Sequence, residues 1–148
     1  VEDRMPESEA VIKQVFPIEA EDFASAGEVS GKIKNTLKRL GVDAALVRRA
    51  AIASYEAELN LVIHSYGGQL SFMVTPTEIR IVTKDTGPGI PDVELAMREG
   101  YSTASEKARE LGFGAGMGLP NIRRCADKVE IQSKMGQGTT VQITFSIQ

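Results

Sequence analysis

Hydrophobic and polar positions follow two periods along this chain, and the changes between the periods divide it into strands and helices. The last segment, residues 139–147, alternates apolar and polar residues cleanly, as a strand with one buried face does. Helical spacing fills residues 21–40 and 43–65. Gly41 ends the first of these helices, and Asp43 stands at the N-cap of the second. The other predicted elements are strands over residues 9–18, 69–75, 78–84 and 128–133 and helices over residues 91–98 and 117–127.

This order of elements predicts a two-layer sandwich of the α/β (α+β) class. The strands at 69–75 and 78–84 are separated only by a short turn around Pro76, which is typical of a hairpin. We therefore expect a mixed, largely antiparallel sheet with helices on one face. No repeat or linker divides the 148 residues, so we expect one domain over residues 9–148 after a disordered segment at 1–8.

Composition limits the classes of function. Hydrophobic residues make up 42% and charged residues 25% of the chain, which is typical of a globular protein in water. The formal net charge of −3 argues against a sequence-independent nucleic-acid binder, which needs a basic face. No apolar run approaches the length of about 18 residues that a membrane span requires. A single cysteine, Cys125, excludes an internal disulfide and is expected to pack as a small core residue. We expect a cytoplasmic protein with neither nucleic acid nor a membrane as a partner.

The helix over residues 43–65 carries the first candidate site residues. Glu56, Asn60 and His64 follow one another at intervals of four, so they share one edge of the helix. Glu58 projects about 200° away from Glu56 and is expected to be solvated. Polar residues are common on helices, so an ordinary surface role stays open for each of them at this point. The predicted core stripe of this helix comprises Ile52, Tyr55, Leu59, Val62, Ile63 and Tyr66.

A loop rich in glycine and proline, DTGPGIP, follows the strand at 78–84. It begins at Asp85 and contains Gly87 and Gly89. Glycines allow a ligand to approach the backbone closely, and the prolines stiffen the turn. A carboxylate at a strand end can accept a hydrogen bond from an exocyclic amino group such as that of adenine. A rigid turn capped by Asp85 is the alternative, while Gly87 and Gly89 exclude a calcium loop because they occupy positions that need oxygen ligands.

A second glycine-rich segment, GFGAGMGL, precedes the predicted helix at 117–127. Backbone N–H groups in such a loop, with a helix N-terminus behind them, can bind phosphate. The sequence lacks the P-loop and dinucleotide-binding patterns. The preceding stretch, about residues 99–115, carries Lys107 and Arg109 among small residues and suits a mobile lid, with an ordinary surface loop as the alternative. The four glycines of the segment are Gly112, Gly114, Gly116 and Gly118.

A last turn, GQGTT, leads into the final strand and contains Thr139; alone it is ordinary hairpin chemistry. Together with the helix EAELNLVIHSYGG and the loops DTGPGIP and GFGAGMGL, in this order, the chain resembles the GHKL ATPases, whose ATP-binding domain has the Bergerat fold. The strings E-x-x-x-N-x-x-I-H-x-Y and G-x-G-L-P-N-I are similar to those of the bacterial anti-sigma-factor serine/threonine kinases, in particular the stressosome switch kinases. The resemblance covers residues 45 to 145.

The resemblance implies ATP and Mg²⁺ as ligands and gives each site residue a role. Asn60 would supply its side-chain oxygen to a Mg²⁺ that bridges the ATP phosphates, and Glu56 would take the proton from an attacking hydroxyl. Asp85 would recognise the adenine amino group, with Thr139 assisting through water. His64 is expected to make a structural hydrogen bond. The other residues expected to contact or shape the ATP site are Gly87, Gly89, Lys107, Arg109, Gly112, Gly114, Gly116 and Gly118.

The function implied by the resemblance is that of a regulatory kinase. It would use Mg-ATP to phosphorylate a serine or threonine of a STAS-domain antagonist protein, and it would switch partners with its nucleotide state. A sigma factor and a second copy of the chain are further candidate partners. A nucleotide-gated binding module without transferase activity, or a detached histidine kinase catalytic domain, is the alternative. Glu56 favours the enzyme, because a pure binder needs Asn60 and Asp85 but no base.

Overall fold

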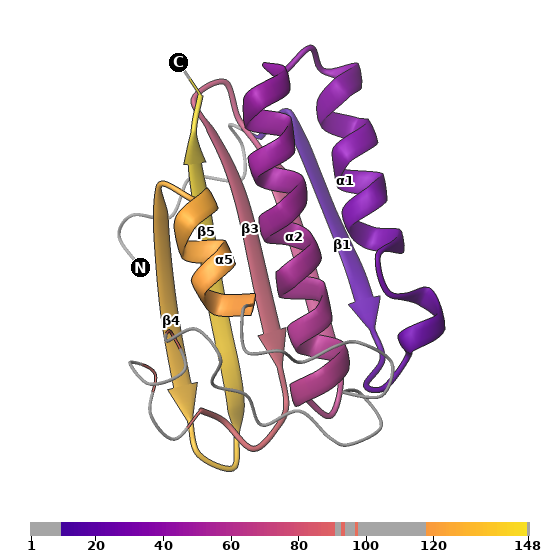
Figure 1. Ribbon diagram of the computed structural model, residues 1–148, viewed down its shortest axis with the longest axis vertical. Helices are drawn as coiled ribbons and strands as arrows, with labels where there is room; N and C mark the ends of the chain where they lie inside the picture. Colours follow the sequence, from indigo (N-terminus) through magenta and orange to yellow (C-terminus); the bar gives the residue numbers. More distant parts are fainter. Residues whose placement is uncertain (1–9, 91–92, 94–96, 98–117, 148) are drawn as a thin grey trace.

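The described part of the protein is an antiparallel sheet with helices packed on one of its faces (Figure 1). The computed structural model describes residues 10–90, 93, 97 and 118–147. Its elements are β1 (Ile12–Ile18), a 3-10 helix (Phe23–Ser25), α1 (Glu28–Arg39), α2 (Ala44–His64), β2 (Gly68–Val74), β3 (Glu78–Asp85), α5 (Gly118–Cys125), β4 (Lys128–Lys134) and β5 (Gly138–Ser146). The strands lie in the order β1-β2-β3-β5-β4, and each neighbouring pair is antiparallel. The predicted two-layer α/β sandwich with helices on one face is confirmed.

Two local signals in the sequence place their elements correctly. The Asp43 carboxylate accepts hydrogen bonds from the backbone N–H groups of Ala45 and Leu46, at 3.1 and 3.4 Å, so it caps α2 as expected. In the turn between β2 and β3, the Thr75 hydroxyl accepts hydrogen bonds from the backbone N–H groups of Thr77 and Glu78, where β3 begins. The β2–β3 hairpin is therefore confirmed.

The N-terminal third differs from its prediction. The helix expected over 21–40 is divided, because Gly27 has φ 99°, a left-handed conformation outside the α-helical region. A single 3-10 turn precedes it, and α1 begins only at Glu28. The first strand starts at Ile12, three residues later than predicted. The predicted disordered segment 1–8 and most of the predicted helix at 91–98 lie outside the described residues, so these two predictions stay untested.

The buried face of α2 is also different from the predicted stripe. Ile52, Tyr55 and Tyr66 are 41%, 38% and 74% exposed, so half of the predicted stripe faces solvent, whereas Leu59 and Val62 are buried. The predicted stripe consists of large apolar side chains, but α2 lies between α1 and α5 over the sheet, and small residues permit that close packing (Figure 1). The fully buried small residues on α2 are Ala50, Ala53 and Ser54, followed by Ala57 at 2%.

Glu58 is buried, and the prediction that it is solvated is wrong. It is 2% exposed, and its carboxylate accepts hydrogen bonds from the N–H groups of Gly27, Val29 and Ser30 at 3.0 to 3.4 Å. These are unpaired donors of the first turn of α1, whose N-cap, Gly27, has no side chain to cap them. A residue of α2 therefore caps α1, which a helical wheel drawn for α2 alone cannot reveal.

Candidate nucleotide-binding and catalytic site

The polar edge of α2 is the starting point of the site. Glu56, Asn60 and His64 lie on successive turns and are all half-buried, as their spacing predicts. Burial lowers the pKa of His64 below its ordinary value of 6.5, because the charged imidazolium loses hydration. His64 is therefore neutral at pH 7, which agrees with a structural role.

The N-terminus of α5 lies against Asn60. A Cβ added to Gly118 would stand 3.0 Å from Asn60 Oδ1 and 3.5 Å from Asn60 Nδ2, so only glycine allows this approach without displacing the amide. The first-turn N–H groups of a helix have no partners within that helix, and its dipole is positive at that end. Asn60 and the start of α5 thus form one polar corner that is suited to a phosphate.

Side-chain contacts tie α5 to α2 further along. The Asn121 side-chain amide donates a 2.8 Å hydrogen bond to Glu56 Oε2, and the Arg124 guanidinium donates to the oxygen of the same amide. At the other end of α5, Arg49 Nε donates to the Cys125 carbonyl oxygen at 2.8 Å. The half-buried Cys125 packs against the hydrophobic core, as expected, and burial raises the pKa of its thiol. The helix is consequently fixed at its start, its middle and its end.

The second part of the site lies at the end of β3. Asp85 Oδ1 accepts a 3.1 Å hydrogen bond from the Thr139 backbone N–H, across the β3–β5 pair. Asp85 Oδ2 accepts no hydrogen bond from a described residue. Burial raises the pKa of the Asp85 carboxyl, and the Thr139 hydrogen bond counteracts part of that effect. The structure therefore brings together Asp85 and Thr139, which are 54 positions apart in the sequence.

The loop that follows Asp85 packs tightly on both sides. A Cβ at Gly87 would stand 3.2 Å from Asp85 Oδ1 and 3.3 Å from Ser65 Cα, at the end of α2. Gly89 has φ 81°, and a Cβ there would lie 2.8 Å from the Lys134 carbonyl oxygen. Gly89 is therefore required by its contact with the β4–β5 turn, in addition to any approach of a ligand.

Two residues of this region have no assigned role in the sequence analysis. Gly138 has φ 130°, and a Cβ there would overlap the Asp85 carbonyl oxygen, so it is needed for β5 to start beside Asp85. The Ser133 hydroxyl accepts from Ile90 N–H at 2.7 Å and lies 2.9 Å from the Thr139 hydroxyl. Gly138 could have been found from the GQGTT motif, whereas Ser133 carries no signal in the sequence, because only the β4–β5 register brings it to Thr139.

Part of the predicted site falls outside the described residues. The structure places Glu56, Asn60 and Gly118 in one group, on the C-terminal half of α2 and at the start of α5, and Asp85, Gly87, Gly89 and Thr139 in another, at the end of β3 and the start of β5. The ends of α2 and β3 lie together at the lower end of Figure 1. The predicted lid, about residues 99–115, and five predicted site residues lie outside the described part of the chain. The residues outside the described part are Lys107, Arg109, Gly112, Gly114 and Gly116.

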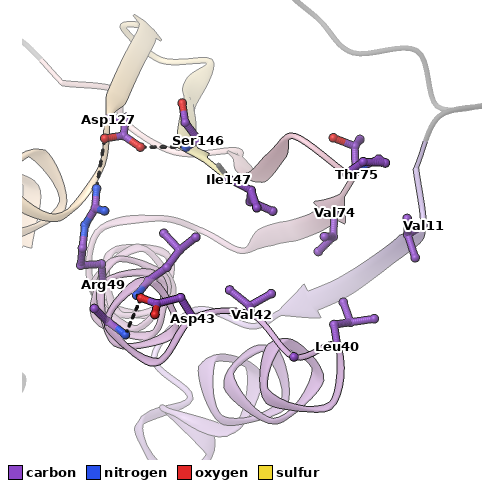
Figure 2. A pocket seen from close by; sticks show the side chains of 14 residues that line it. Val11, Leu40, Val42, Asp43, Arg49, Val74, Thr75, Asp127, Ser146 and Ile147 are labelled. Atoms are coloured by element: carbon purple, nitrogen blue, oxygen red, sulfur yellow. Dashed lines mark hydrogen bonds and ion pairs between the residues drawn. The ribbon is translucent and has the colours of Figure 1, made fainter.

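The opposite end of the sheet holds a hollow of about 1120 Å³ that contains none of the predicted site residues (Figure 2). Val42, Val74 and Ile147 give it apolar walls, and the Arg49–Asp127 ion pair, at 3.1 Å, lies at one side. The hollow is at the N-terminal end of α2, whereas Asp85 is beside the C-terminal end of that helix. It is therefore separate from the candidate nucleotide site.

Comparison with known proteins agrees with this geometry. Residues 45–148 match the family described as "Histidine kinase-, DNA gyrase B-, and HSP90-like ATPase". This chain belongs to that family. The matched range begins at the start of α2 and includes Glu56, Asn60, Asp85 and Thr139. The predicted membership of the GHKL ATPases is confirmed.

Within this family, the chain is similar to a serine/threonine-protein kinase and to anti-sigma factors. The chain is 30% identical over 113 residues to the serine/threonine-protein kinase RsbT of Bacillus subtilis, covering 74% of this chain and 79% of that protein. It is 35% identical over 100 residues to an anti-sigma F factor of Pasteuria penetrans, covering 63% of each chain, and 34% identical over 94 residues to that of Caldanaerobacter subterraneus, covering 60% and 62%. The chain thus spans less than two thirds of these two anti-sigma factors. The predicted kinship with anti-sigma-factor kinases is confirmed.

None of the helices in the described ranges combines the length and the apolar character that crossing a membrane requires.

Proposed function

We propose that this protein is a Mg-ATP-dependent serine/threonine kinase that phosphorylates a STAS-domain antagonist protein and exchanges partners with its nucleotide state. The observation that carries the proposal is the Glu56 carboxylate, held by Asn121 one helical turn from Asn60 and the start of α5. A module that only binds nucleotide needs no fixed carboxylate beside its phosphate corner. The name of the Bacillus relative, a serine/threonine-protein kinase, supports the same class of enzyme.

The adenine end of ATP fits Asp85. Its Oδ1 is occupied by the Thr139 N–H, while its Oδ2 has no donor among the described residues and is available to an exocyclic amino group. The absence of a side chain at Gly87 keeps the space next to this carboxylate open, since a Cβ there would crowd Oδ1. We assign Asp85 to adenine recognition, with Thr139 holding the carboxylate and assisting through water.

The phosphate end fits Asn60 and α5. Asn60 Oδ1 is a hard oxygen ligand of the kind that Mg²⁺ prefers, and it lies beside a helix N-terminus that favours anions. Magnesium bound there with ATP would neutralise charge on the phosphates. The part of the chain that the structure describes has no group of three His, Cys, Asp or Glu side chains placed to hold a metal ion, so we assign most of the remaining ligands to phosphate and water. Lys107, Arg109 and the glycines from 112 to 116 remain proposed phosphate-side residues.

In the proposed transfer step, Glu56 is the only proton acceptor that we assign. The substrate serine or threonine oxygen forms a bond to the γ-phosphorus, and the bond from that phosphorus to the β,γ-bridging oxygen breaks, so that ADP leaves. The hydroxyl proton passes to Glu56 Oε1, the oxygen that the Asn121 contact leaves free among the described residues, and then to water. In phosphoryl transfer, most of the rate enhancement comes from positioning the reactants and neutralising charge.

A single-turnover assay tests the proposal. Transfer from labelled ATP to STAS-domain proteins encoded beside this gene is followed, and the phosphorylated residue is mapped. Glu56→Gln should slow transfer by about 10²–10⁴-fold while Mg-ATP affinity is retained, because the carboxylate serves the attacking group. Glu130→Gln is the matched control, since Glu130 is exposed on β4 and remote from the site.

Three outcomes separate the alternatives. Normal transfer by Glu56→Gln removes the proposed base. If the unmutated protein binds a STAS partner only with ATP but transfers no phosphate, the binding-module alternative is correct. An acid-labile phosphohistidine on the partner identifies a detached histidine kinase domain. A sigma factor as a second partner, a homodimer and a cytoplasmic location stay predictions.

A further inference from the structure

Glu56 accepts one side-chain hydrogen bond among the described residues, and its donor lies on α5. Asn121 Nδ2 donates to Glu56 Oε2 at 2.8 Å, across the α2–α5 interface and 65 positions along the chain. A half-buried glutamate without such a contact samples several rotamers, whereas a proton acceptor must point at the attacking hydroxyl when that hydroxyl arrives. The contact therefore restrains the carboxylate that the proposed reaction needs.

The orientation of the Asn121 amide is itself determined. The Arg124 guanidinium has donors only, and it donates to Asn121 Oδ1. The amide oxygen must consequently face Arg124, and the NH₂ group must face Glu56. Because a carboxylate accepts and an arginine donates, the opposite orientation of the amide would lose both hydrogen bonds.

Contacts at both ends of α5 fix the backbone that carries Asn121. Gly118 lies against the Asn60 amide at the start of α5, and Arg49 binds the Cys125 carbonyl at its end. One eight-residue helix thus contacts the proposed metal ligand through Gly118 and the proposed base through Asn121. The distance between these two contacts is set within a single rigid element.

From this geometry we infer that Asn121 is a positioning residue for Glu56, with Arg124 orienting its amide. The inference rests on the proposed function, in which Glu56 accepts the hydroxyl proton. Asn121 holds Oε2 and leaves Oε1 for the substrate, so the acceptor atom points away from α5. Asn121 itself exchanges no proton and contacts neither ATP nor the substrate.

The kinetic test is a double-mutant cycle with Glu56→Gln and Asn121→Ala. Asn121→Ala should reduce the single-turnover rate by about 10- to 100-fold, as expected when a reacting group is misplaced, while Mg-ATP affinity and the partner's KM are unchanged. In the Glu56→Gln background the same substitution should cause no further loss, because there is no base left to position. Arg124→Ala should lower the rate only when Asn121 is present.

The controls address folding and local charge. Arg123→Ala removes the neighbouring exposed arginine of α5 and should leave the rate unchanged. Asn121→Asp keeps the size of the side chain but removes the donor, so it should slow transfer as Asn121→Ala does. It takes the place of Asn121→Ala if that variant folds poorly. A readout independent of activity is the ¹⁵N resonance of the Asn121 side-chain amide in the nucleotide-free protein, which should move in Glu56→Gln and stay in place in Arg123→Ala.

The results distinguish this inference from the proposed function. Normal transfer by Glu56→Gln overturns the base assignment, and the inference with it. Slow transfer by Glu56→Gln, together with a normal rate in Asn121→Ala or with losses that multiply in the double variant, overturns the inference alone. An Asn121 amide resonance that does not respond to Glu56→Gln also overturns it, because the hydrogen bond would then be absent in solution.

Discussion

Asp85 is held by the Thr139 N–H in surroundings that raise the pKa of its carboxyl. An acid whose folded-state pKa exceeds its unfolded value of 3.8 binds more protons in the native state, so its contribution to stability falls as pH rises through that window. At neutral pH the ionised carboxylate therefore costs the nucleotide-free fold some stability. The proposed binding of adenine by Asp85 accounts for keeping an acid that does not stabilise the nucleotide-free fold.

Asp85→Asn should consequently separate binding from stability. Nucleotide-free Asp85→Asn should melt no lower than the unmutated protein at pH 7, because asparagine can still accept from Thr139 without bearing a charge. The increase in Tm caused by Mg-ATP or Mg-ADP should be mostly lost, since a ligand stabilises only in proportion to its affinity for the native state. Thermal melts with and without nucleotide measure both quantities. A variant that keeps the full nucleotide-induced shift would contradict the assignment of Asp85 to adenine.

At this scale the sequence reveals residues that belong to motifs and misses those that act across elements. Glu56, Asn60 and Asp85 stand in recognisable strings, and the structure places the first two on one edge of α2 and the third at the end of β3. Asn121 lies in the string G-x-G-L-P-N-I, yet nothing in a linear pattern states that it faces Glu56. Ser133 is found only once the β4–β5 register is known.

At the scale of the element, α1 and α2 are joined by a buried carboxylate. The N-cap of α1 is Gly27, which has no side chain to cap the helix, and Glu58 of α2 accepts hydrogen bonds from three backbone N–H groups at this helix start. Spacing along α2 predicts where Glu58 points but not what lies there, because α1 covers that side. The same neighbour buries the alanines of α2, which a search for large apolar residues passes over.

Glu58→Gln should therefore destabilise the fold. The amide keeps one acceptor but turns an NH₂ group toward N–H donors, so at least one buried donor loses its partner, at a cost of about 1–3 kcal/mol in the free energy of unfolding. Urea unfolding measures this loss. Glu28→Gln, at an exposed position in the first turn of α1, is the matched control and should change the free energy of unfolding much less. Equal stability of the two variants would mean that Glu58 does not cap α1 in solution.

At the scale of the whole molecule, the sequence predicts the two-layer class and the largely antiparallel sheet, because hairpins and the alternating last strand are local features, but it does not predict the strand order. The sheet order needed one further fact, the insertion of β5 between β3 and β4, which places Gly138 and Thr139 beside Asp85. That pairing joins residues more than fifty positions apart, and neither period nor turn chemistry specifies it. The end of α2 and the end of β3 meet there, so the site is a product of the complete sheet.

The pH dependence of global unfolding gives a prediction at this scale. Burial lowers the pKa of His64 in the folded protein, so the unfolded chain binds more protons just below pH 6.5. The free energy of unfolding should be at its full value above that pH and should fall as the pH decreases from 6.5 toward the folded-state pKa. His64→Gln should show a shallower decrease over this range, measured as the difference between the urea unfolding curves of the two proteins. A difference that is constant with pH, or that slopes the other way, would contradict a buried neutral His64.

Both described ends of the chain lie at the end of the sheet that is remote from Asp85. Val11 N–H donates to the Val74 carbonyl, and Ile147 N–H donates to the Thr77 carbonyl. The start of β1 and the end of β5 therefore both lie beside the β2–β3 turn. A fluorophore or surface anchor joined directly after Ile147 would therefore start its linker at the opposite end of the sheet from Asp85, the proposed adenine-binding residue. Immobilised in this way, the protein should bind ATP and a phosphorylation partner as it does in free solution, and single-molecule measurements of partner exchange become practical without an insertion in the catalytic domain.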